Sequence, residues 1–329
     1  MVTIRKLQQT GGEKGSSFLI ILPKDWVVRH DLRKGNPVVV AEREDGCLIV
    51  DPRLPKAGEA RTTTIQIEAN LRWEITSKYL LGFDEIRVIS DRPITNDQRL
   101  ELKKIINRFV ALEITDEISH EEGHEIVVRC LVDPSTLPVR KAMKRMNLIA
   151  SRMLNDALRA YFEGTKDVAD DVIERDEEVD RLFFLIVREL RSAIQYPRMS
   201  EMMSIAPVEA LDLRLAAQYI ERIADLSVDI ARRTDKAPIG GIIKRMETIA
   251  DKVRTMLSKS VENLFKFDPE KVVSVIRAEK ELIEDTSRTR EYILSKSSRE
   301  PHTELFVIDS LLRIGEAAKD IVDLALPQS

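Results

Sequence analysis

Cysteine is scarce in this 329-residue chain, which has two, Cys47 and Cys130, in different segments. A disulfide framework is therefore not expected, and a reducing compartment is the natural setting. Long apolar runs are also missing, since none approaches the roughly 20 residues that span a bilayer. The first residues, MVTIRK, lack the apolar core of a secretory signal. We therefore expect a cytoplasmic protein without a transmembrane segment.

Signatures of catalysis are missing as well. The sequence has no nucleophile elbow, no glycine-rich phosphate loop and no paired catalytic cysteine and histidine, so we expect no enzyme and assign no catalytic residue. A net charge of −4 argues against a protein that coats nucleic acid over its whole surface. Aromatic residues at 5% and charged residues at 33% are instead typical of a helical, water-soluble protein. At this length we expect two or three domains.

The first of these domains, residues 1–53, is predicted to be a small β unit. Apolar runs at 18–22, 38–41 and 47–50 read as strands, and the first of them reads as buried. So few residues cannot bury this much aliphatic surface alone. The segment therefore predicts pairing with a second copy, in a homodimer or a larger assembly.

Three stretches of this segment carry a family resemblance. RKLQQTGG at 5–12, SSFLIILPKDW at 16–26 and LRKG at 32–35 resemble the AbrB/SpoVT/MazE swapped-hairpin domain. The resemblance implies a dimeric N-terminal swapped-hairpin β-barrel that binds DNA. The sequence departs from the pattern at 13–15, which lengthens a loop, and at 36–37, where Asn-Pro stands in place of an acidic residue.

The charge of the segment agrees with that resemblance. Residues 1–40 carry a surplus of about four positive charges, which a dimer would double into a patch able to neutralise several phosphates. The alternative is that these residues only solvate a dimerisation domain. The candidate DNA-binding residues are Arg5, Lys6, Lys24, Arg29, Arg33 and Lys34.

After a linker, residues 61–133 are predicted to form a small α/β middle domain with the order βαβαββ. The expected strands are 63–67, 85–90, 111–117 and 125–132, and the expected helices are 71–81 and 96–109. His120 and His124 suggest a metal site, but a polar turn between two strands explains them better. The role of this domain stays open between a linker, a dimer interface and a small-molecule sensor.

Beyond Pro138, helical periodicity dominates. Six helices are predicted, at 139–162, 168–196, 207–233, 239–265, 269–297 and 303–326, and they fall into two groups of three, 138–235 and 238–327. The groups resemble each other, as DVIERDEE at 171–178 and SVIRAEKE at 274–281 illustrate. The repeat predicts a C-terminal all-α pair of three-helix bundles, so the whole chain is expected to be a multi-domain α+β protein.

Acidic pairs mark the first group of helices. Asp176 and Asp180 are four residues apart, as are Glu221 and Asp225, so each pair lies on one helix face. Two such helices side by side would direct four carboxylates at one spot, which suits a hard or borderline cation. The alternative is a solvated salt-bridge network with nearby arginines, namely Arg175, Arg181, Arg188 and Arg222.

The helical half resembles the PhoU family of phosphate-signalling regulators, whose (E/D)-x-x-x-D motif these pairs match. The resemblance implies a metal ion (Fe, Zn, Mn or Mg) held by Asp176, Asp180, Glu221 and Asp225. The second group departs from the motif: Ile283 and Leu312 replace two acids, Glu279 and Glu316 remain, and Glu281 and Asp285 keep the spacing in a shifted phase. We therefore expect a weakened or absent second site.

Together the two resemblances imply a DNA-binding transcriptional regulator of phosphate uptake, with a helical body that senses or relays phosphate status. The alternative is a signalling adaptor that does not bind DNA, and whose body contacts the ATPase of a phosphate ABC transporter or a kinase. A third, weaker reading is a metal-storage or architectural protein. The sequence leaves the operator, the effector and the direction of regulation open.

Overall fold

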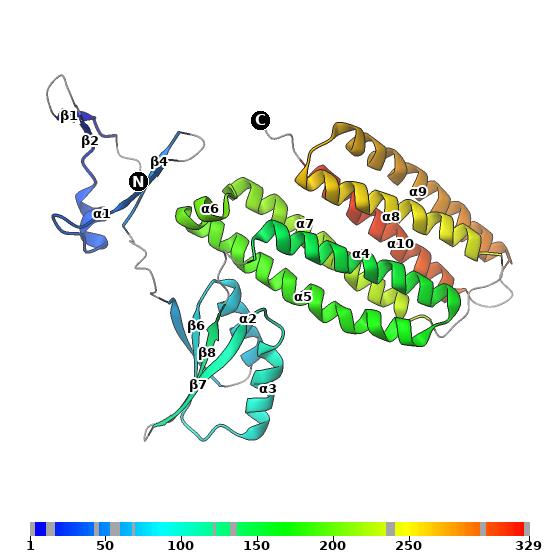
Figure 1. Cartoon of the computed structure of the whole chain (residues 1–329), viewed down its shortest axis with the longest axis horizontal. Coiled ribbons are helices and arrows are strands. Elements are labelled where there is room, and N and C mark those ends of the chain that lie inside the picture. The colour runs from blue at the N-terminus through cyan, green and yellow to red at the C-terminus, as the bar shows by residue number, and fades with distance from the viewer. Residues whose placement is uncertain are drawn as a thin grey trace. The chain divides into compact units, whose positions relative to one another are not determined.

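The computed structural model describes residues 4–10, 17–42, 46–52, 60–67, 70–120, 123–131, 137–234, 241–296 and 301–325. The chain divides into two compact units, Met1–Glu59 and Ala60–Ser329. The first holds short strands and one short helix. The second holds a four-stranded sheet with its helices and a body of long helices (Figure 1).

The first unit consists of two separate antiparallel strand pairs, and one helix lies between the pairs in the sequence. Its elements are β1 (Gln8–Thr10), β2 (Ser17–Leu19), α1 (Lys24–Arg29), β3 (Val39–Glu42) and β4 (Leu48–Asp51). The expected β-barrel is therefore not closed by the described residues of one chain. The expected burial of 18–22 was also wrong for one chain, because Phe18 is 66% exposed and Ile20 56% exposed. The described residues of the first unit supply no second layer to cover these side chains.

The α/β part of the second unit has the predicted order βαβαββ. Its elements are β5 (Thr62–Gln66), α2 (Leu71–Leu80), β6 (Glu85–Ser90), α3 (Asn96–Ile106), β7 (Leu112–His120) and β8 (Gly123–Cys130). The sheet order is β5-β6-β8-β7, with β5 parallel to β6 and the other pairs antiparallel. Both helices cover one face of the sheet (Figure 1). Their buried side chains include Ile75, Tyr79 and Leu102.

In the α/β part, the end of α3 differs from the prediction, whereas the β7–β8 hairpin agrees with it. Helix α3 ends three residues earlier than predicted, because Arg108 and Phe109 close tighter turns onto Ile105 and Ile106. The histidine segment forms the predicted β7–β8 hairpin, in which the His124 ring accepts or donates a 3.0 Å hydrogen bond with Ser119.

In its described residues, the helical body contains the six predicted helices and one more. The bounds are α4 (Val139–Glu163), α5 (Lys166–Gln195), α6 (Pro197–Met203), α7 (Pro207–Ala231), α8 (Ile243–Phe265), α9 (Pro269–Lys296) and α10 (His302–Asp323). Pro197 was predicted only to end a helix, but it also begins the short α6, because proline is well suited to the first helical position. Asp268 caps α9 by accepting a 3.0 Å hydrogen bond from Glu270 N–H, and Pro269 takes the first helical position.

The long helices form two groups of three, α4-α5-α7 and α8-α9-α10, joined chiefly where α7 packs on α10. One continuous apolar core runs through both groups. Helices α9 and α10 approach closely at Gly315, where a Cβ atom would lie 2.1 Å from Leu282 Cδ2. Within the described residues, no helix is long and apolar enough to cross a membrane.

Arg188 of α5 connects the helical body to the α/β part. Its side chain is buried, and its guanidinium donates 2.8 Å hydrogen bonds to the carbonyl oxygens of Tyr79 and Phe83 and to the Asp84 carboxylate. The same group lies 5.0 Å from the centre of the Tyr79 ring. A planar guanidinium can satisfy three acceptors at once, so this one side chain fixes how α2 and the following turn lie on α5.

Candidate functional site

Helices α5 and α7 pack along each other and bring the two predicted acidic pairs together. On α5, Asp176 and Asp180 flank the buried Val179, and on α7 Glu221 lies beside the buried Ile220. The apolar stripes of both helices face the core, so the acids occupy the border between core and solvent. Asp176, Asp180, Glu221 and Asp225 are called the carboxylate cluster below.

The pKa values of the cluster are raised by partial burial and by the repulsion between neighbouring carboxylates. Burial, followed by the charges of Asp180 and Asp225, raises the pKa of Asp176 to about 6. Burial and then Asp225, Asp180 and Asp176 raise the pKa of Glu221 to about 7. Burial also raises the pKa of Asp180 and of Asp225. The four groups therefore resist full ionisation together, and a cation among them would relieve that cost.

Partners inside the protein relieve part of this repulsion. Arg108, just beyond α3 in the α/β part, lies 3.7 Å from Asp180, measured between Nη2 and Oδ2. Gln218 donates a 2.7 Å hydrogen bond from Nε2 to Glu221 Oε2. Sequence reasoning missed Arg108, because a contact between residues 72 positions apart in different structural parts leaves no local pattern.

The alternative salt-bridge network is not formed between the described residues. Arg175 binds Asp156 and Asp171 instead, at 2.7 and 2.6 Å, and Arg188 binds Asp84. Neither Arg181 nor Arg222 has an ion pair with the cluster among the residues that the structure describes. Among the described residues, Arg108 is therefore the arginine that pairs with the cluster, while the charges of Arg222 and Arg232 act on Asp225 without forming an ion pair.

The donor atoms of the cluster are carboxylate oxygens, which fit a hard or borderline cation. Across the described ranges, no three histidine, cysteine, aspartate or glutamate side chains gather as a ready ligand set. A metal ion would therefore require the four side chains to move closer together than they are here. The metal site stays a prediction.

In the second three-helix group, the acidic pair that keeps the spacing in a shifted phase is already neutralised. Lys252 of α8 donates to Glu281 at 3.0 Å and to Asp285 at 2.8 Å. Ile283, which replaces one acid of the motif, is 49% exposed. Lys252 therefore supplies the positive charge for this pair, and the weaker second site stays a prediction.

The candidate DNA-binding residues all lie in the first unit and are all exposed. Only Arg33 has an ion pair among the described residues, with Asp31 at 3.8 Å, and both side chains are more than four-fifths exposed. Arg5 and Lys6 precede β1, Lys24 and Arg29 are the two ends of α1, and Arg33 and Lys34 follow α1. Their contact with DNA stays a prediction.

Comparison with known proteins concerns the helical body. The profile of the PhoU domain matches residues 143–234 and 246–325. A phosphate-specific transport system accessory protein PhoU homolog of Pseudomonas putida is 24% identical over 202 residues, covering 57% of this chain and 76% of that protein. The homolog of Clostridium acetobutylicum is 26% identical over 152 residues, covering 46% and 57%. The crystal structure of PhoU from Pseudomonas aeruginosa superposes with a TM-score of 0.52 at 20% identity, covering 57% of this chain and 93% of that one.

Proposed function

The chain belongs to the PhoU family, and from this we propose that it is an accessory regulator of phosphate transport whose helical body acts by binding another protein. The observation that carries the proposal is the family match, which spans both three-helix groups. Relatives of similar sequence are named as accessory proteins of the phosphate-specific transport system. The partner that fits is a cytosolic subunit of that system, its ATPase, or a kinase that reads its state.

The test is phosphate uptake in cells that lack the gene. Deletion should change the rate of radiolabelled phosphate uptake, and the intact chain should restore it. A chain with Arg5→Ala and Lys24→Ala should restore uptake equally well, because the proposed contact lies in the helical body. Unchanged uptake after deletion would contradict the proposal, and failure of only the double variant would favour action through DNA.

We also propose that the carboxylate cluster holds a metal ion in the first three-helix group. Asp176, Asp180, Glu221 and Asp225 would hold it, and it would supply positive charge where like charges now repel. Elemental analysis of the purified chain tests this, with Asp180→Asn plus Asp225→Asn as the variant. Glu174→Gln, on the same helix and exposed, is the matched control. Equal metal content in the double variant and the control would exclude the site.

A second candidate function, DNA binding, is favoured by one feature of the first unit. Its strands expose apolar side chains that a second copy would cover, and its basic residues lie on the surface around them. A dimer that neutralises six to eight phosphates should lose affinity with salt at a log–log slope of roughly −5 to −7. Arg5→Ala with Lys24→Ala should flatten that slope. A double variant with unchanged affinity would leave the unit as a dimerisation element.

A further inference from the structure

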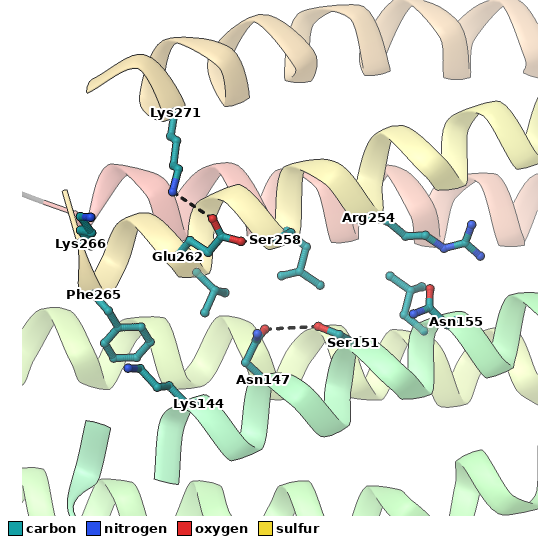
Figure 2. A pocket seen from close by; sticks show the side chains of 13 residues that line it. Lys144, Asn147, Ser151, Asn155, Arg254, Ser258, Glu262, Phe265, Lys266 and Lys271 are labelled. Atoms are coloured by element: carbon teal, nitrogen blue, oxygen red, sulfur yellow. Dashed lines mark hydrogen bonds and ion pairs between the residues drawn. The ribbon is translucent and has the colours of Figure 1, made fainter. Parts of the chain in front are cut away.

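A groove runs between α4 and α8, the first helices of the two three-helix groups (Figure 2). The groups are held together mainly by α7 and α10, while α4 and α8 contact each other only sparingly. The resulting space has a volume of about 660 Å³, within the usual range for small-molecule sites. It is lined by other residues than the carboxylate cluster, which belongs to α5 and α7.

One end of the groove has an excess of positive charge. Lys144, Lys266 and Lys271 lie around Phe265 there (Figure 2). Lys271 is neutralised by Glu262 at 2.9 Å, and this bond, with another from Ser258, lowers the pKa of Glu262. Lys144 stands 5.0 Å from the centre of the Phe265 ring, and neither it nor Lys266 forms an ion pair with any described residue. Both ammonium groups are exposed to solvent, and an anion at this end of the groove could pair with both of them.

The other end offers a hydrogen-bond donor that is already charge-balanced. Arg254 binds Asp251 through Nη1 at 2.6 Å, while its Nε atom is shielded from solvent and has no hydrogen-bond partner in the described part of the chain. A shielded donor without an acceptor is unfavourable, and such groups are rare. Because the charge of Arg254 is balanced by Asp251, this end suits a neutral acceptor better than a second anion. Asn155 lies beside it (Figure 2).

Between the two ends, the groove combines amides and hydroxyls with an apolar floor. Asn147, Ser151 and Ser258 lie along the middle (Figure 2). The floor is formed by Leu154, Leu257 and Val261. With a single, paired carboxylate in its lining, the groove does not suit a metal ion. It suits a molecule with an apolar, acceptor-bearing body and an anionic group at one end.

We propose that the α4–α8 groove binds a nucleoside phosphate, with its phosphoryl groups at Lys144 and Lys266 and an acceptor atom of its base at Arg254 Nε, which a rotation of the partly exposed Arg254 side chain would uncover. The ring of the base would lie on the apolar floor, and the ribose would meet the amides and hydroxyls between. Because α4 and α8 belong to different three-helix groups, the bound molecule would touch both. The proposal is independent of the phosphate-transport role.

The test is calorimetric titration of the full chain with ADP in buffer containing EDTA, which keeps metal chemistry at the carboxylate cluster out of the measurement. ADP should bind saturably, and adenosine and inorganic phosphate should each bind at least about tenfold more weakly, since each supplies only part of the contacts. Lys144→Gln with Lys266→Gln should weaken ADP binding about tenfold or more. Both lysines are exposed, so their replacement should leave the fold intact.

Arg288→Gln is the matched control, because Arg288 is an exposed residue of α9 that does not line the groove. It should leave the affinity for ADP unchanged. Absence of ADP binding up to about 1 mM would overturn the proposal. Equal affinity in the double lysine variant would also overturn it, and so would inorganic phosphate binding as tightly as ADP, because the nucleoside contacts would then contribute nothing.

Discussion

Replacing Glu221 by glutamine should stabilise the helical body at alkaline pH and not at acid pH. The pKa of Glu221 is raised from the ordinary 4.5 to about 7, first by burial and then by the charges of Asp225, Asp180 and Asp176. A carboxyl with a raised pKa holds its proton more tightly in the folded state. Its contribution to stability is therefore fully present below about pH 4.5 and is lost as the pH rises through about 7. Glutamine stays neutral and avoids that loss.

The magnitude follows from the same two pKa values. Their difference corresponds to an upper bound of about 3 kcal/mol, at about 1.4 kcal/mol per pH unit. Glu221 is only half-buried, and solvent screens its repulsion, so we expect about 1 kcal/mol at pH 8.5. The 2.7 Å bond from Gln218 is retained by the amide oxygen, so little is lost at pH 5.

The assay is thermal unfolding followed by helical circular dichroism at pH 5 and pH 8.5, with EDTA present to remove cations. Glu221→Gln should raise the midpoint by about 2–4 °C at pH 8.5 and leave it nearly unchanged at pH 5. Glu174→Gln, an exposed residue of α5, should change neither value. An equal shift at both pH values, or the same gain in the control, would refute the electrostatic account of the cluster.

Three further predictions concern stability and assembly. Arg188→Ala should lower the free energy of unfolding by about 2–4 kcal/mol and speed hydrogen exchange in α2, because it leaves two carbonyls and the Asp84 carboxylate without their shared donor. Arg191→Ala, at an exposed position, should have little effect on either quantity. Gly315→Ala should lower the free energy of unfolding by about 1–2 kcal/mol through its clash with Leu282, and the loss should be less than additive when it is combined with Leu282→Ala; additive losses would argue against the clash. Deleting residues 1–51 should reduce the number of chains per particle, obtained from the light-scattering mass divided by the chain mass, because the exposed apolar strands of the first unit are expected to pair between chains. An unchanged number of chains would count against that role.

Features that depend on neighbouring residues, such as helix faces and helix ends, could be predicted from the sequence. Residues four apart share a helix face, so the two acidic pairs and their place beside the core could be predicted from spacing alone. The predicted helix end at 162 lies just before Gly164, which ends α4 with a φ of 71°, a conformation that glycine adopts readily. The start of α6 was missed because a proline after a helix was read as an end and not also as a beginning.

Contacts between distant parts of the chain were beyond sequence reasoning. Arg188 reads as one more charged residue on a long helix, and only the docking of α2 on α5 reveals its three acceptors. The α4–α8 groove likewise depends on how the two three-helix groups meet through α7 and α10. The burial of Phe18 was wrongly predicted for one chain, because an apolar sequence pattern does not distinguish burial within a chain from burial between chains.

The position of Arg108 near Asp180 has a consequence for competition at the carboxylate cluster. Because Arg188 anchors the α/β part on α5, the Arg108 guanidinium is a tethered counter-ion with a high effective concentration, of the order of millimolar for short tethers. Any free cation that binds Asp180 must displace a charge that cannot diffuse away. Arg108→Ala should therefore tighten the binding of a divalent ion at the cluster. Cation binding at the cluster and the contact of the α/β part with α5 through Arg108 are therefore coupled, so that a change in one shifts the other.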